Sequence, residues 1–159
     1  MQHAPLNTRD VLYGCRTEAT VLHYAIRDGE TIEYYDIMRL YLYVCKYSKF
    51  PVGHPKIHVG DASRDKQAIL SKEGLIKYTV LLSKRLCHPV QQFRCNNKLL
   101  FCLCRTCTVE CIFSSEWVHE STAQKSVKST WVLGEVMLAI QKGYQVLHIM
   151  EMYRNKVTK

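Results

Sequence analysis

The sequence predicts an α+β fold in which an antiparallel sheet carries helices on one face. Three observations predict it. The turn pairs Asp28-Gly29 and Asn96-Asn97 each lie between runs of β-branched, aromatic or aliphatic residues, which is typical of antiparallel hairpins. Near the C-terminus, a helical pattern of apolar residues passes directly into a strand-like one. With 159 residues, the chain is long enough to bury a core as one domain.

The first predicted hairpin joins residues 20–26 to residues 31–36 through Asp28-Gly29. It is expected to deliver Asp36 to the edge of the sheet, at the point where a strand turns into a helix. A carboxylate in this position can hold a divalent metal, while the free N–H groups of the helix face an anion. The alternative is that Asp36 simply caps the helix.

The helix itself is expected over residues 38–47, because apolar residues recur there at helical spacing. Pro51 and Gly53 prevent its continuation. Residues 60–73 are polar, and a short helix is expected within them over residues 65–70.

A strand is expected over residues 75–82. The second hairpin follows, and its strands are residues 91–93 and 99–103. Residues 114–129 are polar and show no periodic pattern, so they are expected to form a connection.

Thr130 is expected to cap a helix over residues 132–142, and Gly143 to supply the left-handed residue at its end. Residues 144–153 alternate as a closing strand. The first hairpin is expected to pair with this strand or with the strand before the second hairpin. The two longer helices are expected to cover one face of the resulting sheet.

The charge of the chain is unevenly distributed. There are 22 Lys and Arg side chains against 14 Asp and Glu, for a net charge of +8 and a pI near 9.1. By count, residues 81–159 carry 11 basic and 5 acidic side chains, so this half holds +6 of the +8. Such an excess suits contact with a phosphate backbone, and it equally suits a merely soluble basic surface. No apolar run approaches the roughly 20 residues of a membrane span and no signal-peptide pattern opens the chain, so an intracellular location is expected.

Eight cysteines without an export signal are expected to be reduced. Among the four clustered ones, Cys104 and Cys107 have the two-residue spacing that zinc ligands favour. Cys111 with His119 could complete a tetrahedral set, which predicts a structural zinc site. The alternative is that these cysteines are ordinary strand residues, with Cys102 and Cys104 on one buried face.

The segment around Asp36 resembles motif A of the family B DNA polymerases, whose pattern is Asp, two variable residues, then Ser-Leu-Tyr-Pro. Asp36, Leu40 and Tyr41 match this pattern, while Arg39 and Leu42 stand where Ser and Pro are expected. Arg39 puts a long cation beside the expected triphosphate site, and Leu42 loses the fixed φ of proline.

Further motifs keep the order found in the protein-primed polymerases of Maverick/Polinton transposons and related viruses. Upstream, Tyr13, Gly14, Arg16 and Thr17 are similar to the Tyr-x-Gly-Gly element that joins the exonuclease and polymerisation modules, with Cys15 in place of the second Gly. The resemblance extends over residues 11–153. The remaining matching runs are Lys49-Phe50-Pro51-Val52-Gly53-His54-Pro55, Gly74-Leu75-Ile76-Lys77, His88-Pro89-Val90, Leu103-Cys104-Arg105-Thr106-Cys107 and Thr130-Trp131-Val132.

The resemblance implies that Asp36 is catalytic, as the first of two aspartates that hold Mg²⁺ while deoxynucleotides are added to a DNA 3′ hydroxyl. It implies that Tyr41 packs beneath the deoxyribose and rejects ribose. The implied partners are a DNA template-primer, deoxynucleotide triphosphates and a terminal protein primer. The implied nucleotide-binding residues are Ile37, Arg39, Leu40 and Tyr41, and the implied DNA-binding residues are Tyr13, Gly14, Arg16 and Thr17.

Two parts of a complete polymerisation centre are missing from the sequence: the Asp-Thr-Asp-like element with the second aspartate, and the Lys-x3-Asn-Ser-x-Tyr-Gly helix with the nucleotide-binding cation. Residues 1–159 are therefore interpreted as a single partial palm domain that is inactive alone. It comprises the linker element and motif A region (11–60), a strand-rich, Cys-containing insertion (74–113) and a helix–strand closing unit (130–153). Two other interpretations stay open: a zinc-stabilised nucleic-acid-binding module, and a non-catalytic structural remnant.

Overall fold

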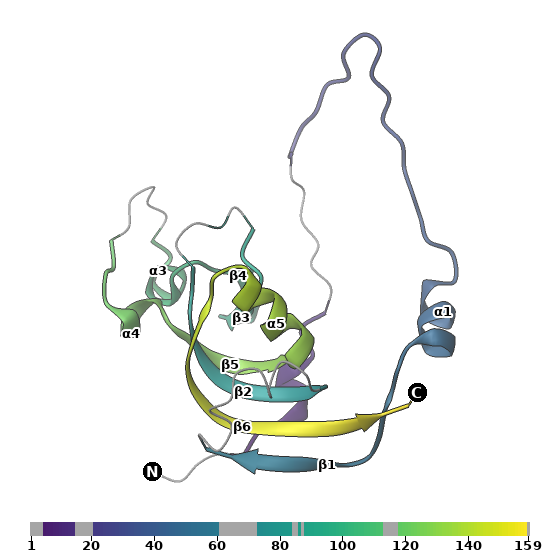
Figure 1. Cartoon of the computed structure of the whole chain (residues 1–159). Coiled ribbons are helices and arrows are strands. Elements are labelled where there is room, and N and C mark those ends of the chain that lie inside the picture. The colour runs from purple at the N-terminus through teal and green to yellow at the C-terminus, as the bar shows by residue number, and fades with distance from the viewer. Residues whose placement is uncertain are drawn as a thin grey trace.

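The computed structural model describes residues 5–14, 21–60, 73–83, 86, 88–112 and 118–158 (Figure 1). It confirms the predicted α+β class. The elements in chain order are η1 (Thr8–Val11), α1 (Leu40–Tyr47), β1 (Pro51–Val59), β2 (Gly74–Leu81), β3 (Gln92–Cys95), β4 (Lys98–Phe101), α3 (Arg105–Glu110), α4 (Thr122–Lys125), β5 (Val127–Val132), α5 (Leu133–Gln141) and β6 (Gln145–Val157).

The main sheet is antiparallel and has the strand order β1-β6-β2-β5 (Figure 1). β6 has 13 residues and pairs with β1 along one edge and with β2 along the other. Met152 therefore lies opposite His58 on one side and opposite Ile76 on the other. β3 and β4 form a separate two-stranded ribbon.

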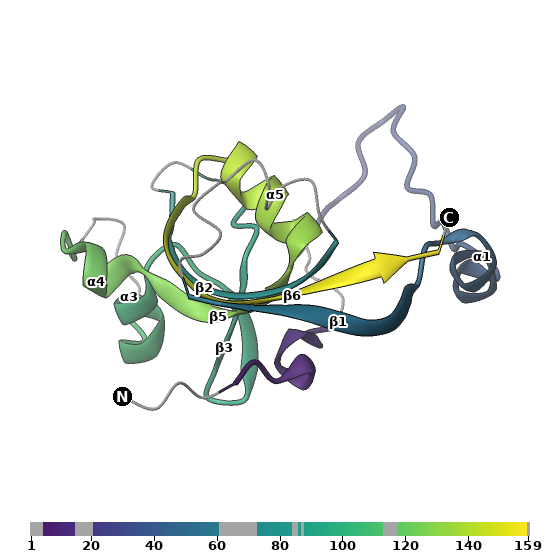
Figure 2. The same ribbon diagram turned by 60° about the horizontal axis from the view of Figure 1, so that its bottom comes forward.

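The core lies between α5 and one face of the sheet (Figure 2). Burial alternates along β2, where Ile76, Tyr78 and Val80 are buried and the residues between them are half-buried. Trp131 of β5 packs edge-on against Tyr78, with ring centroids 4.9 Å apart. Its indole N–H donates to the carbonyl of Gln92 at 3.0 Å, which ties the β3–β4 ribbon to the core.

Residues 5–14, which we name the N-terminal strap, cross the other face of the sheet (Figure 2). The backbone N–H of Leu6 donates to Glu151 Oε2 at 2.6 Å, and the Tyr153 hydroxyl donates to the carbonyl of Leu6 at 3.3 Å. Leu6 and Val11 are buried. The two hydrogen bonds anchor the strap to β6, and the burial of Leu6 and Val11 removes their own apolar surface from water.

The elements with strong local signals are confirmed. The strand predicted over residues 75–82 is β2, and the helix predicted over residues 132–142 is α5. The closing strand forms as β6, and Gly143 ends α5 with φ +88°. Within the ribbon, φ is +48° at Asn96 and +62° at Asn97, as a two-residue type I′ hairpin turn requires.

The first predicted hairpin is wrong. Residues 21–36 form no strand in the described part of the chain, and Figure 1 shows them as a long excursion that stands clear of the sheet. Only the turn forms, where the Glu30 N–H donates to the Arg27 carbonyl at 3.0 Å. Tyr24 donates its hydroxyl hydrogen to the Glu30 carboxylate at 2.7 Å across it. A β-prone run becomes a strand only when neighbouring strands or a core cover it, and no described element covers this one.

The helix predicted over residues 38–47 is confirmed as α1, which begins at Leu40 and ends at Tyr47. Its expected packing on the sheet is wrong, because none of its residues is buried. Figure 1 shows α1 beyond the ends of β1 and β6, away from the core.

β1 is a strand that the sequence did not predict. The segment contains Pro51, Gly53 and Pro55, and these residue types usually break regular structure. An edge strand tolerates them because its outer N–H groups have no ladder partner. The ladder between β1 and β6 shifts register between Val52 and Lys56, next to these residues.

The expected connection over residues 114–129 is also wrong in part, since it contains α4 and the start of β5. Thr130 is buried inside β5 and caps no helix. The N-cap residue of α5 is Val132, whose side chain makes no capping hydrogen bond. The short helix predicted over residues 65–70 lies outside the described residues.

Candidate functional site

Asp36 is the last residue of the exposed excursion, and α1 begins four residues later, at Leu40. Asp36 is exposed and belongs to no sheet edge, so the predicted position at a strand end is wrong. Arg39 is the N-cap residue of α1 and has a left-handed backbone with φ +61°. The first N–H groups of α1 have no partner within the helix and are available to an anion.

The other predicted nucleotide-binding residues are also exposed. Tyr41 has 85% of its surface exposed, Ile37 68% and Leu40 43%. The candidate site is thus one short segment whose side chains are open to solvent. Its residues are Asp36, Ile37, Arg39, Leu40 and Tyr41. Among the described residues, Asp36 belongs to no group of three or more side chains that could hold a metal ion; such a group lies elsewhere in the chain.

That group consists of Cys104, Cys107 and His119, whose ligand atoms all lie within 4.8 Å of one another. His119 Nδ1 is 3.2 Å from Cys107 Sγ and 3.6 Å from Cys104 Sγ. A tetrahedral zinc ion with ordinary bond lengths separates its sulfur and nitrogen ligands by about 3.6 Å, so the spacing fits zinc. The donor set of two thiols and one imidazole also suits this metal.

The local structure brings these three side chains together from two directions. Cys104 is the N-cap residue of α3, and Cys107 lies inside that helix. His119 comes from the stretch that leads to α4. The two helices are joined because Thr106 Oγ1 donates to the Gln124 carbonyl at 2.9 Å. Cys104 is buried, whereas Cys107 and His119 are half-buried, so the group is open to solvent on one side.

Cys111, the predicted third ligand, lies outside this group. It is the exposed C-cap residue of α3 and has a left-handed backbone with φ +55°. Partial burial and a hydrogen bond with the Cys104 thiol raise the pKa of Cys107, so a metal that binds here has to displace a proton. Burial raises the pKa of Cys102 to about 11, which keeps that buried thiol protonated at neutral pH.

The alternative that these cysteines are strand residues is wrong, because β4 ends at Phe101 and α3 begins at Arg105, so none of the four lies in a strand. Cys102 and Cys104 are nevertheless both buried, as that alternative expected.

Of the predicted DNA-binding residues, Tyr13 and Gly14 are described, and Arg16 and Thr17 lie outside the described residues. Gly14 is exposed and has φ +83°. Tyr13 is half-buried, and its hydroxyl lies 2.6 Å from Ser129 Oγ. Burial raises the pKa of Tyr13, and its hydrogen bond with Ser129 opposes the shift.

A cavity of about 280 Å³ is lined by Tyr13 together with three cations to which the sequence patterns gave no binding role, namely Lys77, Arg94 and Lys128. No local pattern could have found them, because they come from β2, β3 and β5. Only the pairing of the strands brings them close.

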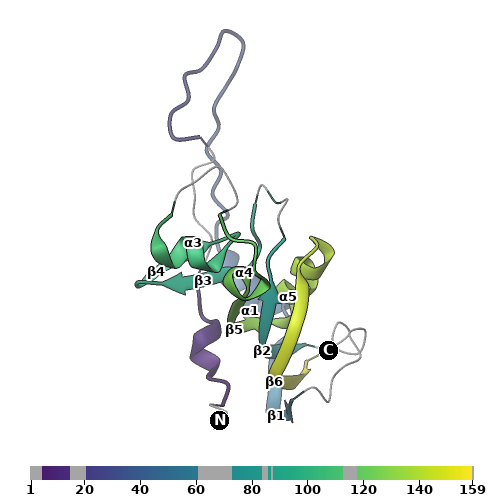
Figure 3. The same cartoon turned by 90° about the vertical axis from the view of Figure 1, so that its left-hand side faces the viewer.

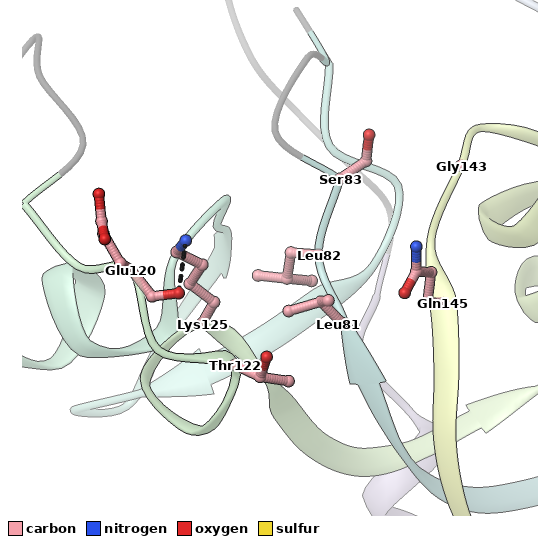
Figure 4. Close-up of a pocket in the computed structure, with 8 residues that line it drawn as sticks. All are labelled: Leu81, Leu82, Ser83, Glu120, Thr122, Lys125, Gly143 and Gln145. Carbon is pink, nitrogen blue, oxygen red and sulfur yellow. Dashed lines mark hydrogen bonds between the residues drawn. The ribbon is translucent and has the colours of Figure 1, made fainter.

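A larger cavity of about 490 Å³ lies between the end of β2 and the α4 region (Figure 4). Its walls include the buried Lys125, whose ammonium donates to the Glu120 carbonyl at 2.9 Å. None of the predicted site residues lines it. The complete lining is Leu81, Leu82, Ser83, Glu120, Thr122, Lys125, Gly143 and Gln145.

Residues 6–157 match the family model described as DNA polymerase type B, organellar and viral. Comparisons with curated proteins and with solved structures found no match. Among the described residues, no helix combines the length and apolar character that a membrane crossing requires.

Proposed function

This chain belongs to the organellar and viral type B DNA polymerases, and from that premise we propose that it supplies the motif A part of the palm of a protein-primed DNA polymerase. The family carries out DNA replication as a nucleotidyltransferase, and membership implies DNA, nucleotides and a divalent metal ion as its substrates and cofactor. We further propose that the polymerase comes from a transposon or a virus, that a terminal protein primes its synthesis and that its metal ion is magnesium.

One observation carries the proposal: Asp36 lies three residues before Arg39, the N-cap residue of α1, and every implied nucleotide-binding residue is exposed on the same segment. Magnesium in such enzymes is held by one or two carboxylates together with substrate phosphates, and the exposed carboxylate of Asp36 fits as one of these ligands. When bound, the metal ions activate the 3′ hydroxyl and stabilise the charge on the transferred phosphoryl group.

The other residues of the segment have binding roles in this proposal. The free N–H groups at the start of α1 face the triphosphate, where the helix dipole favours negative charge. Arg39, at the N-cap, adds a cation beside the same phosphates. The exposed ring of Tyr41 packs beneath the deoxyribose and leaves no room for a ribose 2′ hydroxyl.

A downstream part of the polymerase completes this site by covering the excursion and α1. The apolar surface on this segment supports that idea, because a soluble monomer rarely exposes so many large apolar side chains together. The second catalytic carboxylate comes from the covering part, so residues 1–159 behave as one partial domain and do not extend a primer alone. The exposed apolar residues of the segment are Val21, Leu22, Tyr24, Ile26, Ile32, Tyr34, Tyr35, Ile37, Met38, Leu40, Tyr41, Leu42, Tyr43, Val44 and Tyr47.

The test is primer extension by the 159-residue chain, alone and after the downstream half of a related palm is supplied. The chain alone is expected to be inactive and the completed polymerase active. In the completed polymerase, Asp36→Asn is expected to abolish extension and leave DNA binding intact, while Asp28→Asn, in the turn of the same excursion, serves as the control. Full activity of the Asp36→Asn enzyme would refute the assignment, as would robust extension by the chain alone.

The role of Tyr41 has its own matched control on the same helix. Tyr41→Ala is expected to increase the incorporation of ribonucleotides, because the ring beneath the sugar is lost. Tyr43→Ala removes another exposed ring of the same helix, whose centroid lies 4.7 Å from that of Tyr47, and is expected to leave sugar discrimination unchanged. Equal ribonucleotide incorporation by the two variants would contradict the proposed sugar contact.

A structural zinc ion held by Cys104, Cys107 and His119 is the second element of the proposal, and it keeps open the rival function of a zinc-stabilised nucleic-acid-binding module. The ligand distances given above support it. The ion would join α3 to the stretch before α4, in a part of the chain where neither helix is long enough to be stable alone.

Elemental analysis and cobalt substitution test the zinc ion. One metal per chain and a thiolate–cobalt charge-transfer band are expected, and both are expected to be lost in His119→Ala and Cys107→Ser. Cys45→Ser, which changes an exposed cysteine on α1, should keep both signals. A chain purified and refolded with zinc that still contains none would exclude the site.

A further inference from the structure

The cavity around Tyr13 is built by four segments that are far apart in the sequence. The N-terminal strap contributes Asp10 and Tyr13, β2 contributes Lys77, β3 contributes Arg94, and β5 contributes Lys128, Ser129 and Thr130. Figure 3 shows η1 and the β3–β4 ribbon on the same flank of the sheet. We name this cavity of about 280 Å³ the basic groove.

Cations dominate the charge of the basic groove. Lys77, Arg94 and Lys128 line it against one carboxylate, that of Asp10. Lys77 also faces the buried Glu151 across the β2–β6 ladder, so the balance depends chiefly on Arg94 and Lys128. Both of these side chains are exposed, and among the described residues neither forms an ion pair. Their charge is therefore available to an anion from solution.

The geometry holds Arg94 in place before any ligand arrives. Its guanidinium donates to the carbonyl of Leu12 at 3.2 Å and lies over the ring of Tyr13, 5.6 Å from the centroid. A guanidinium has five N–H donors, so most of them remain for a ligand. Because the side chain is already ordered, less conformational entropy is lost when an anion binds.

The hydroxyl pair of Tyr13 and Ser129 adds a neutral donor to these cations. Their oxygens are 2.6 Å apart, and the Tyr13 hydroxyl also lies 3.3 Å from the carbonyl of Thr130. The Tyr13 hydroxyl donates its hydrogen to the Thr130 carbonyl, so the Ser129 hydroxyl is the member of the pair that can turn its hydrogen to a ligand oxygen. Arginine, lysine and hydroxyl donors are the set that proteins use to contact backbone phosphates of nucleic acids.

We propose that the basic groove binds a backbone phosphate of single-stranded DNA, with Arg94 and Lys128 as the main contacts and Tyr13 as the residue that positions Arg94. The basic groove is slightly smaller than the pockets that bind ordinary small molecules, so its volume suits a single phosphate with its sugar. The inference rests on the proposed function only for its choice of DNA as the source of the phosphate. It adds three cations to the DNA-contacting residues and does not involve Asp36.

The experiment measures binding of a fluorescent oligo(dT) by the isolated 159-residue chain, by anisotropy over a series of salt concentrations. Arg94→Gln and Lys128→Gln are each expected to weaken binding roughly three- to tenfold at low salt and to lower the slope of log K against log salt by about 0.7. The matched control is Lys98→Gln, which removes the same charge from the exposed start of β4, outside the groove. It is expected to change neither quantity.

Each alternative outcome overturns the proposal. An equal loss from Lys98→Gln would show that binding depends on net charge and on no particular site. A lack of effect from Lys128→Gln would exclude the groove, and this variant removes no hydrogen bond that holds the strap. Inorganic phosphate that protects the groove lysines from acetylation, with oligo(dT) giving no protection, would assign the groove to a small free anion. Because no synthesis is measured, a failure here differs from a failure of primer extension by the completed polymerase.

Discussion

Gly74 opens β2 at a point where two backbones approach so closely that only glycine fits. A Cβ on this residue would lie 1.9 Å from the carbonyl oxygen of Tyr153 and 3.2 Å from the Cα of Arg154. Both are backbone atoms of β6, so no side-chain rotation can relieve the clash. In Gly74→Ala, the two strands must move apart by about 1 Å, because Cβ atoms rarely come within 3.0 Å of a non-bonded atom.

The size of the effect follows from the bonds near this point. Separation of the strands weakens the Gly74–Arg154 pairing and the hydrogen bond from the Asn155 N–H to the Glu73 carbonyl at 3.0 Å. Two hydrogen bonds at about 1 kcal/mol each and backbone strain of about 1–3 kcal/mol give a loss of roughly 3–5 kcal/mol. The smaller entropy of an unfolded chain with alanine offsets about 0.5 kcal/mol of this. The midpoint of thermal unfolding should therefore fall by about 10 °C.

Urea and thermal unfolding, followed by circular dichroism, measure this change. Gly134→Ala is the matched control, because a Cβ there meets no atom within 4 Å and alanine favours the helix α5. The control should keep the stability of the parent chain or gain up to about 1 kcal/mol. A Gly74→Ala protein with the parent midpoint would refute the close approach of β2 and β6.

Three further predictions concern the core. Tyr78→Phe should leave the free energy of unfolding in urea unchanged or raise it by about 1 kcal/mol, because the buried hydroxyl has no partner among the described residues. A lower free energy of unfolding would show that this hydroxyl does have a hydrogen-bond partner. Trp131→Phe should lower the free energy of unfolding by roughly 2–4 kcal/mol in the same assay, because part of the indole volume is lost and the Gln92 carbonyl loses its donor. An unchanged free energy of unfolding would contradict the hydrogen bond between Trp131 and Gln92. Burial raises the pKa of Cys102 from 9.0 to about 11, so the folded state holds this proton more tightly than the unfolded state. The resulting stability is complete below pH 9 and is lost as the pH rises to 11, by at most about 3 kcal/mol. Over that range the parent chain should lose more stability than Cys102→Ala, whereas parallel profiles would contradict the shift.

Several elements could be predicted from the sequence because their causes are local. Asn96 and Asn97 tolerate the left-handed backbone that a two-residue hairpin needs, and the ribbon forms around them. The helix α5 and the strand β6 follow from an apolar period that changes at Gly143. In the candidate site, the spacing of Cys104 and Cys107 is equally local, since both positions belong to the start of one helix.

The tertiary structure decided the rest, because it depends on which distant segments meet. The run over residues 31–36 has the composition of a strand and meets no partner among the described elements, whereas the proline-containing β1 becomes a strand because β6 offers it an edge. His119 approaches Cys104 and Cys107 while Cys111 turns away at the left-handed end of α3. The basic groove exists only because the strap and three strands converge on it. Composition and spacing along a chain describe neighbours in sequence, and these contacts are set by burial of the common core and by pairing in the sheet.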